Sequence, residues 1–256
     1  MKQRALFVFY PLLAGLFFFS FAAQSQEVTK GDLNSWLLQY TRLVLNSKWT
    51  VTNEIHYRTG EFLSNPGLLL IRPSVDYHVN KEVEFSVGYT YVHADPFEPY
   101  SLPIPADEHN IWWQAWVKNR IGKVELQHRF REEHRWQDNV EQTDEGAYKK
   151  NGTHFNNRFR YRFVIDFNLF EFRNNQSLFC LLFDEVWLSQ NSKLLFTDLN
   201  RNWLYAGLGF KFNSKSNIQL GFNYQSDKVA PGEFINSPVI QLSYFHNFHL
   251  KSSNSE

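Results

Sequence analysis

The stretch Phe155–Phe167, FNNRFRYRFVIDF, decides the fold because large apolar side chains and arginines alternate along it. Aromatic residues occupy every second position from 159 to 163, and Arg158, Arg160 and Arg162 occupy the positions between them. A period of two residues indicates a β-strand, because successive side chains of a strand point to opposite faces. This strand therefore has one apolar face and one strongly charged face, and the two faces must meet different surroundings.

The same period recurs through the rest of the chain. About eleven segments after Asn34 show it, and no convincing helical period competes with them. Most are near the ~9–11 residues that a tilted transmembrane strand needs. Clear examples are Lys48–Arg58, Val83–Tyr91, Leu204–Phe212 and Ile218–Tyr224. The sequence predicts an all-β fold, a closed antiparallel transmembrane β-barrel of about twelve strands, with ten as the alternative. Bacterial barrels have even strand numbers, so either a further strand lies within Glu27–Ser35 or one of the eleven segments is miscounted.

The connections between these segments alternate in length. Short ones such as Asn46–Lys48 and Asn80–Glu82 take turns with longer polar ones such as Ala94–Asp107 and Trp136–Thr153. Outer-membrane barrels have short periplasmic turns at one end and longer extracellular loops at the other. This alternation therefore favours a barrel of that kind.

The N-terminus has the layout of a secretory signal. Lys2 and Arg4 precede an uncharged run, Ala5–Phe21, and small residues follow it. We expect residues 1–25 to be a cleaved signal peptide and residues 26–256 to form one barrel domain, with an uncleaved inner-membrane anchor as the alternative. The 26 basic and 26 acidic side chains balance, so charge does not favour a nucleic-acid partner. The single cysteine, Cys180, excludes an intramolecular disulfide framework.

The direction in which each face points separates two classes of barrel. In a membrane barrel the apolar face meets lipid and the charged face lines the lumen, whereas a soluble lipocalin-like barrel reverses this. Export, strand length, and aromatic residues near strand ends, where an interfacial girdle would lie, favour the membrane. These aromatic residues are Trp36, Trp49, Tyr91, Trp112, Trp113, Trp136, Trp187 and Trp203. The last strand ends near the aromatic Phe248, a feature that the barrel assembly machinery uses. We therefore predict a bacterial outer-membrane protein in contact with lipid and lipopolysaccharide, with a soluble periplasmic binding barrel as the alternative.

With the polar face internal, a cluster of charged residues of both signs faces the lumen. Its predicted members are Glu54, Arg58, Arg72, Asp76, Glu125, Arg129, Arg131, Arg158, Arg160, Arg162 and Glu185. The cluster forms either a selective constriction in a narrow passive pore or a set of ion pairs that fills the lumen of a structural barrel. Three arginines on one strand face repel one another unless acids lie opposite them. By strand order the nearest acids are Glu125, Glu133 and Glu185.

An outer-membrane lipid hydrolase is a third interpretation. Its chemistry needs a serine within hydrogen-bond reach of a histidine on the outer wall. His128, His134 and His246 lie on the predicted lipid face, whereas Ser243 lies on the opposite face from His246. His128 and His134 are roughly 20 Å apart along one strand, too far to share a metal ion. We therefore predict no catalytic residue, metal site or cofactor.

Several short strings, in order across nearly the whole chain after the signal segment, resemble one bacterial family. They are Trp49, Arg72–Tyr77, Glu108–Trp112, His128–Glu132, Arg158–Arg162, Asp184–Trp187 and Asn200–Gly209. Together they are similar to DUF2490, a family of unknown function known largely from Bacteroidetes and Proteobacteria. The resemblance implies a barrel in the outer membrane and supplies no established activity. The small-solute ligand of such a barrel, if it has one, is not identified by the sequence.

Overall fold

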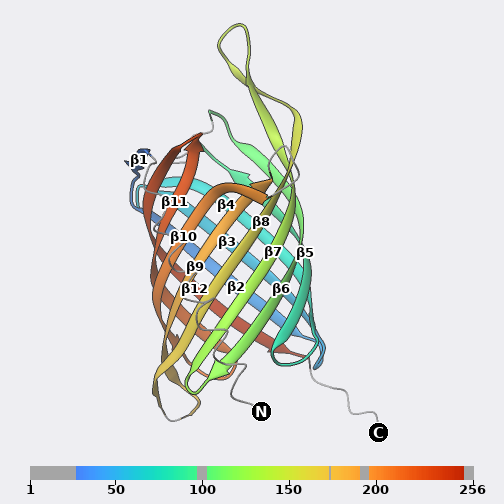
Figure 1. Ribbon diagram of the computed structural model, residues 1–256, viewed down its shortest axis with the longest axis vertical. Coiled ribbons are helices and arrows are strands. Elements are labelled where there is room, and N and C mark those ends of the chain that lie inside the picture. The colour runs from blue at the N-terminus through green and yellow to red at the C-terminus, as the bar shows by residue number, and fades with distance from the viewer. Residues whose placement is uncertain (1–26, 97–102, 173, 191–195, 251–256) are drawn as a thin grey trace.

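The computed structural model describes residues 27–96, 103–172, 174–190 and 196–250, and these form one sheet of twelve strands (Figure 1). The all-β prediction is confirmed. The predicted signal peptide, residues 1–25, lies outside the described residues. Within the described ranges there is no helix of the length and apolarity that crossing a membrane requires.

In the described ranges the strands follow one another along the chain with no other regular element between them. They are β1 (Glu27–Lys30), β2 (Asn34–Val44), β3 (Trp49–Gly60), β4 (Asn65–His78), β5 (Val83–Ala94), β6 (Ala106–Ile121), β7 (Val124–Gln142), β8 (Tyr148–Glu171), β9 (Ser177–Gln190), β10 (Phe196–Lys211), β11 (Ser216–Ala230) and β12 (Glu233–His249).

The sheet closes on itself through β2 and β12, which run parallel from the Asn34–Val239 pair to the Val44–His249 pair. From β2 to β12 every pair of consecutive strands is antiparallel. The closed wall thus has eleven strands, and an odd number leaves one parallel seam. The prediction of about twelve strands is confirmed by β1, which lies within Glu27–Ser35. β1 pairs in parallel with the first residues of β12, before the stretch of β12 that pairs with β2. It is therefore not a twelfth strand of the closed wall.

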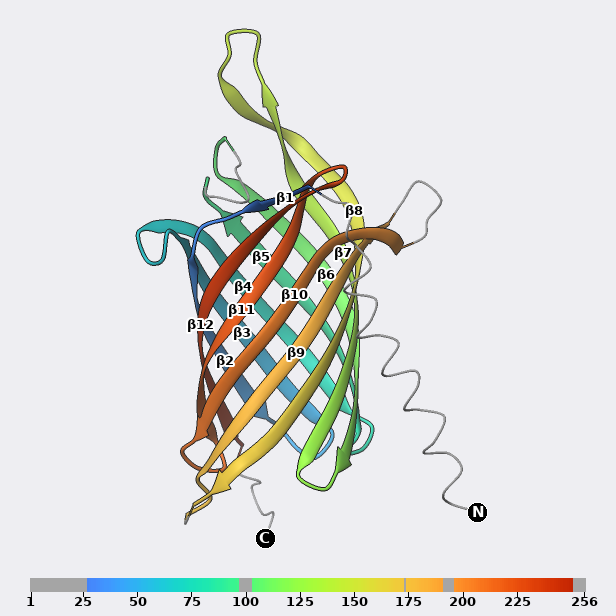
Figure 2. The same ribbon diagram turned by 60° about the vertical axis from the view of Figure 1, so that its left-hand side comes forward.

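The five turns at one end of the barrel are short, as the sequence predicts, but the segments at the other end are shorter than expected. Strands β7 and β8 continue through most of Trp136–Thr153, pairing as far as Gln142 with Tyr148. Their hairpin projects beyond the rim of the barrel (Figures 1 and 2). A tight turn at residues 231–232 joins β11 to β12. Polar strands can extend in this way because the backbone ladder, rather than apolar burial, pairs them.

The side chains are distributed inside-out relative to a soluble protein. Val87, Leu220 and Phe155 point outward, and each is more than half exposed. Arg131 and Glu133 point inward and are 1% and 0% exposed. Within each strand the alternation predicted from the sequence thus places the apolar face outside and the charged face inside.

Glycines on the inner face let aromatic rings lie flat against the wall. A Cβ atom on Gly88 would come within 2.3 Å of the Trp112 indole and 2.7 Å of the Pro73 carbonyl oxygen. A Cβ atom on Gly209 would come within 2.1 Å of the Phe179 ring. No side chain fits in such a space without moving backbone or a buried ring.

We expect Gly88→Val to lower the free energy of unfolding by about 1–3 kcal/mol, because the added methyl groups displace the Trp112 ring. The measurement is the urea midpoint of unfolding of the purified protein. Val87→Ile, on the outer face of the same strand, is the matched control and should leave the midpoint unchanged. Equal midpoints for the two variants would contradict this packing.

Candidate functional site

The register of β7, β8 and β9 brings like charges together inside the barrel. Arg129 lies beside Arg162, and Arg131 lies beside Arg160, across the β7–β8 pair. Opposed like charges on neighbouring strands are destabilising. The stability of this wall therefore depends on carboxylates that reach the same level of the lumen.

Glu185 of β9 is the first of these carboxylates, and it is fully buried. Arg160 Nε donates to its Oε1 at 2.8 Å, and Arg162 Nε donates to its Oε2 at 2.9 Å. Arg129 donates to Oε1 as well. One carboxylate thus accepts hydrogen bonds from three guanidinium groups, the charge-assisted kind that is stronger than a neutral hydrogen bond.

Glu133 of β7 is the second carboxylate and is equally buried. Arg158 Nε donates to its Oε2 at 2.7 Å, and Arg160 Nη1 donates to its Oε1 at 2.8 Å. Arg131 Nη1 stands 3.8 Å from that oxygen. Because Arg160 contacts both Glu133 and Glu185, it joins the two carboxylates into one network.

A third carboxylate, Glu54 of β3, lies across from β4 at the same level. Arg72 Nη1 donates to Glu54 Oε2 at 2.9 Å, and Arg72 Nε donates to Thr90 Oγ1 at 2.9 Å. His56 contacts the same carboxylate at 3.3 Å. We call the nine charged residues of this level the arginine–glutamate cluster: Glu54, Arg72, Arg129, Arg131, Glu133, Arg158, Arg160, Arg162 and Glu185.

Three of the predicted lumen residues lie outside the arginine–glutamate cluster. Arg58 stacks over the Trp36 ring, 3.7 Å from its centroid. Asp76 lies nearer the short turns and accepts hydrogen bonds from Thr52 and Ser74. Glu125 lies beside the β6–β7 turn, where Arg120 donates to it at 2.5 Å. Glu125 therefore does not face the arginines of β8, although it was one of the acids expected there.

Uncharged inward side chains complete the site, and a prediction limited to charged residues does not include them. Gln114 accepts hydrogen bonds from Nε and Nη2 of Arg131 at 2.9 and 2.7 Å. Trp187 lies under the Arg160 guanidinium, 3.6 Å from the ring centroid. Alternation along β6 and β9 assigns both residues to the inner face, which is the signal that could have identified them.

Tryptophans from distant strands fill the lumen beside the cluster. The Trp36 ring of β2 contacts the Trp203 ring of β10 at 5.1 Å between centroids, although β11 and β12 separate those strands in the wall. Trp203 in turn packs on Trp187 of β9 at 4.3 Å. All three side chains are buried inside the barrel, so the prediction that they belong to an interfacial girdle is wrong. This contact crosses the interior and narrows it.

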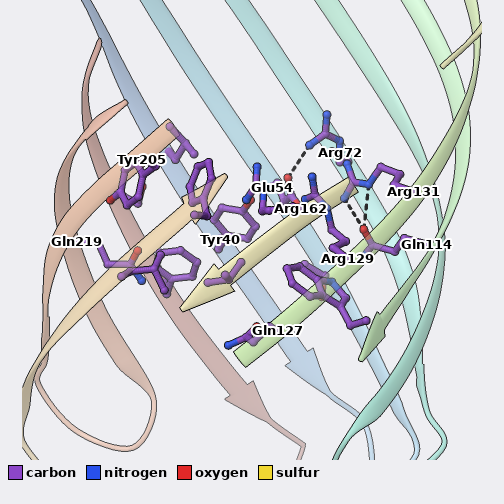
Figure 3. Close-up of a pocket in the computed structure, with 18 of the residues that line it drawn as sticks. Tyr40, Glu54, Arg72, Gln114, Gln127, Arg129, Arg131, Arg162, Tyr205 and Gln219 are labelled. Carbon is purple, nitrogen blue, oxygen red and sulfur yellow. Dashed lines mark hydrogen bonds and ion pairs between the residues drawn. The ribbon is translucent and has the colours of Figure 1, made fainter. Parts of the chain in front are cut away.

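A cavity of about 310 Å³ lies inside the barrel and reaches from the cluster toward the short turns. Figure 3 shows Arg72, Arg129 and Arg131 on one side of it and Tyr205 and Gln219 on the other. The cavity therefore has a cationic wall and an uncharged polar wall that face each other.

The histidines on the outer wall have local partners. His128 Nδ1 lies 2.8 Å from the Tyr161 hydroxyl, and His134 Nδ1 lies 2.7 Å from Asn157 Oδ1. His246 Nδ1 lies 2.8 Å from Ser216 Oγ. In the part of the chain that the structure describes, no group of three or more His, Cys, Asp or Glu residues could hold a metal ion.

The closed wall and its charged interior define the chain as an all-β barrel. The family model "Protein of unknown function (DUF2490)" matches residues 33–236, which include nearly all of that wall. The chain belongs to this family, as the resemblance of its short strings predicts. No curated protein matches the chain.

We expect Glu185→Gln to lower the free energy of unfolding by about 3–5 kcal/mol, because it leaves three buried arginines without their shared carboxylate. Urea unfolding of the purified protein measures this change. Glu125→Gln removes the same charge from a partly exposed pair and should cost about 1 kcal/mol or less. A Glu185→Gln protein as stable as the wild type would show that the cluster does not hold the barrel together.

Proposed function

We propose that this chain spans a bacterial outer membrane as a narrow barrel whose lumen is closed by its own side chains. One observation carries the proposal: Glu133 and Glu185 are 0% exposed inside a wall whose outer face bears rows of exposed apolar residues. A lipocalin-like barrel would place those apolar residues inside. An apolar outer face of this kind fits the hydrocarbon of a bilayer. Strands within hydrocarbon must form a closed wall, because their backbone groups have no other hydrogen-bond partners there.

Aromatic and charged residues on the outer face mark the two ends of the proposed lipid-facing band. Trp49 and Tyr77 pack together beside the short turns, 4.8 Å between ring centroids. Near the other end, Lys150 Nζ donates to Asp107 at 2.9 Å and pairs with Asp138 at 2.7 Å. Although burial alone would raise it, the pKa of the Asp107 carboxyl is held well below its usual value by hydrogen bonds from His93, Lys150 and Tyr91. This charged group fits water beyond the headgroups.

The apolar band is interrupted over β7–β10 by two outward carboxylates. Asp184 accepts a hydrogen bond from Asn202 at 2.6 Å, and Glu132 stands 3.8 Å from His134. Carboxylates on the lipid face cost less than arginine or lysine does at the same depth. The two pairs reduce that cost further, so the interruption is compatible with lipid contact.

Side chains occupy much of the lumen at the level of the arginine–glutamate cluster, beside the cavity. Ion pairs between β7, β8 and β9 occupy one side, and the contact between Trp36 and Trp203 occupies the other. Of the two interpretations left open by the sequence, this arrangement favours the plugged barrel over a passive pore that stays open.

We expect the wild-type protein to give no steady conductance in planar lipid bilayers. The double variant Trp36→Ala with Trp203→Ala should open steps that select anions, because arginines then line the passage. Trp113→Ala, on the outer face, is the control and should stay silent. Steady wild-type openings would overturn the closed lumen.

Membrane insertion has its own test. The protein should pellet with outer membranes and should migrate faster on a gel when it is not heated, because a closed barrel resists unfolding in detergent. Recovery in the soluble periplasmic fraction would overturn the proposed location and leave the barrel fold unaffected.

The lipid hydrolase has one observation in its favour, the contact between Ser216 and His246 on the outer wall. The pair lies beside the turn at residues 212–215, at the end of the barrel with the short turns. A hydrolase would release fatty acid from phospholipid or lipopolysaccharide with calcium present, and Ser216→Ala would abolish that release. We expect the wild-type protein to release none.

A further inference from the structure

The arginine–glutamate cluster contains more positive than negative charge. It has six arginines, all at most 18% exposed, and three glutamates, so its formal charge is +3. Buried charges are stable when opposite charges and hydrogen bonds compensate them. The cluster is therefore suited to take up additional negative charge.

Two arginines that line the cavity each have a guanidinium nitrogen without a hydrogen-bond partner. Arg129 Nε and Arg131 Nη1 are buried and make no hydrogen bond, and the carboxylate oxygen paired with Arg131 Nη1 is 3.8 Å away. The Arg131 side chain is only 1% exposed. Buried donors of this kind are costly to leave without an acceptor. The two arginines thus present unused donors at one wall of the cavity.

The opposite wall carries buried polar atoms that also lack partners. Neither Oδ1 nor Nδ2 of Asn223 makes a hydrogen bond, although the residue is 0% exposed. The Tyr205 hydroxyl is buried and without a partner as well. Both residues line the same cavity as Arg129 and Arg131. The cationic wall thus offers hydrogen-bond donors only, whereas the opposite wall offers both donors and acceptors.

We propose that this cavity binds a small oxyanion of the phosphate or phosphomonoester class. Its charged oxygens bond to Arg129 and Arg131, since a guanidinium fork matches the geometry of phosphate. A hydroxyl-bearing body extends toward Tyr205 and Asn223. The volume of about 310 Å³ is at the lower end of the ~300–1,000 Å³ of pockets that hold small molecules, so the cavity has room for more than a bare phosphate.

The ligand enters from the end with the short turns. A second hollow at that end shares Arg42, Glu84 and Lys118 with the lining of the cavity. Lys48, Lys81 and Glu82 also line it, so the hollow has four lysine and arginine side chains and two glutamates. This basic mouth attracts anions, and the attraction weakens as salt concentration rises.

Titration calorimetry on the protein purified in detergent tests the site, with inorganic phosphate and glycerol 3-phosphate as the two probes. We expect both to bind and expect Arg131→Gln to weaken both at least tenfold. Arg120→Gln, which removes the same charge from the exposed pair with Glu125, should change each affinity less than twofold. Asn223→Leu should weaken glycerol 3-phosphate more than inorganic phosphate, because only the ester reaches that wall.

Three results would overturn the site. They are no binding of either probe at millimolar concentration, equal affinity in Arg131→Gln and wild type, and competition by chloride as strong as that by inorganic phosphate. If Arg131→Gln does not fold, Arg131→Lys replaces it. The lysine keeps the charge and loses the fork, so at least a fivefold loss is expected and an unchanged affinity overturns the site. The inference is separable from the proposed function, because the cavity would bind its anion whether or not the barrel lies in a membrane.

Discussion

Arg160 bridges two carboxylates that solvent does not reach, and the interior of the barrel is organised around that bridge. Arginines cannot be buried along a strand unless acids meet them at the same level. Glu133 and Glu185 meet this requirement from the two neighbouring strands. The wall can therefore keep its charged face inside and its apolar face outside, and closure protects the ion pairs from water.

The local pattern of Phe155–Phe167 predicts both the strand and the interior position of its arginines, because a period of two depends only on neighbouring residues. Glu185 as a partner also follows from strand order. The position of Glu125 along the barrel axis does not follow from strand order. Glu125 and Glu133 share a strand and a face, and only the register with β8 shows which of them lies beside the arginines. The parallel seam is equally hidden, because the Asn34–Val239 pairing joins segments about two hundred residues apart.

The interior is asymmetric around its axis. Strands β7 and β8 contribute most of the arginines, whereas β10 and β11 contribute amide, hydroxyl and aromatic groups. A uniformly charged lumen would hold ions without orienting them. Two unlike walls across one cavity instead fix the direction of any polar molecule between them, as a few placed polar groups do in ligand pockets. The same asymmetry lets Trp203 reach Trp36 without displacing an ion pair.

The parallel seam also determines where the chain can be cut and rejoined. In a barrel with an even number of strands, the first and last strands are antiparallel neighbours, so a short linker can connect their ends. Here β2 starts at the rim opposite to the one where β12 stops. Circular permutants are tolerated when the ends lie close together. For this barrel the joining peptide would have to run the full height of the wall.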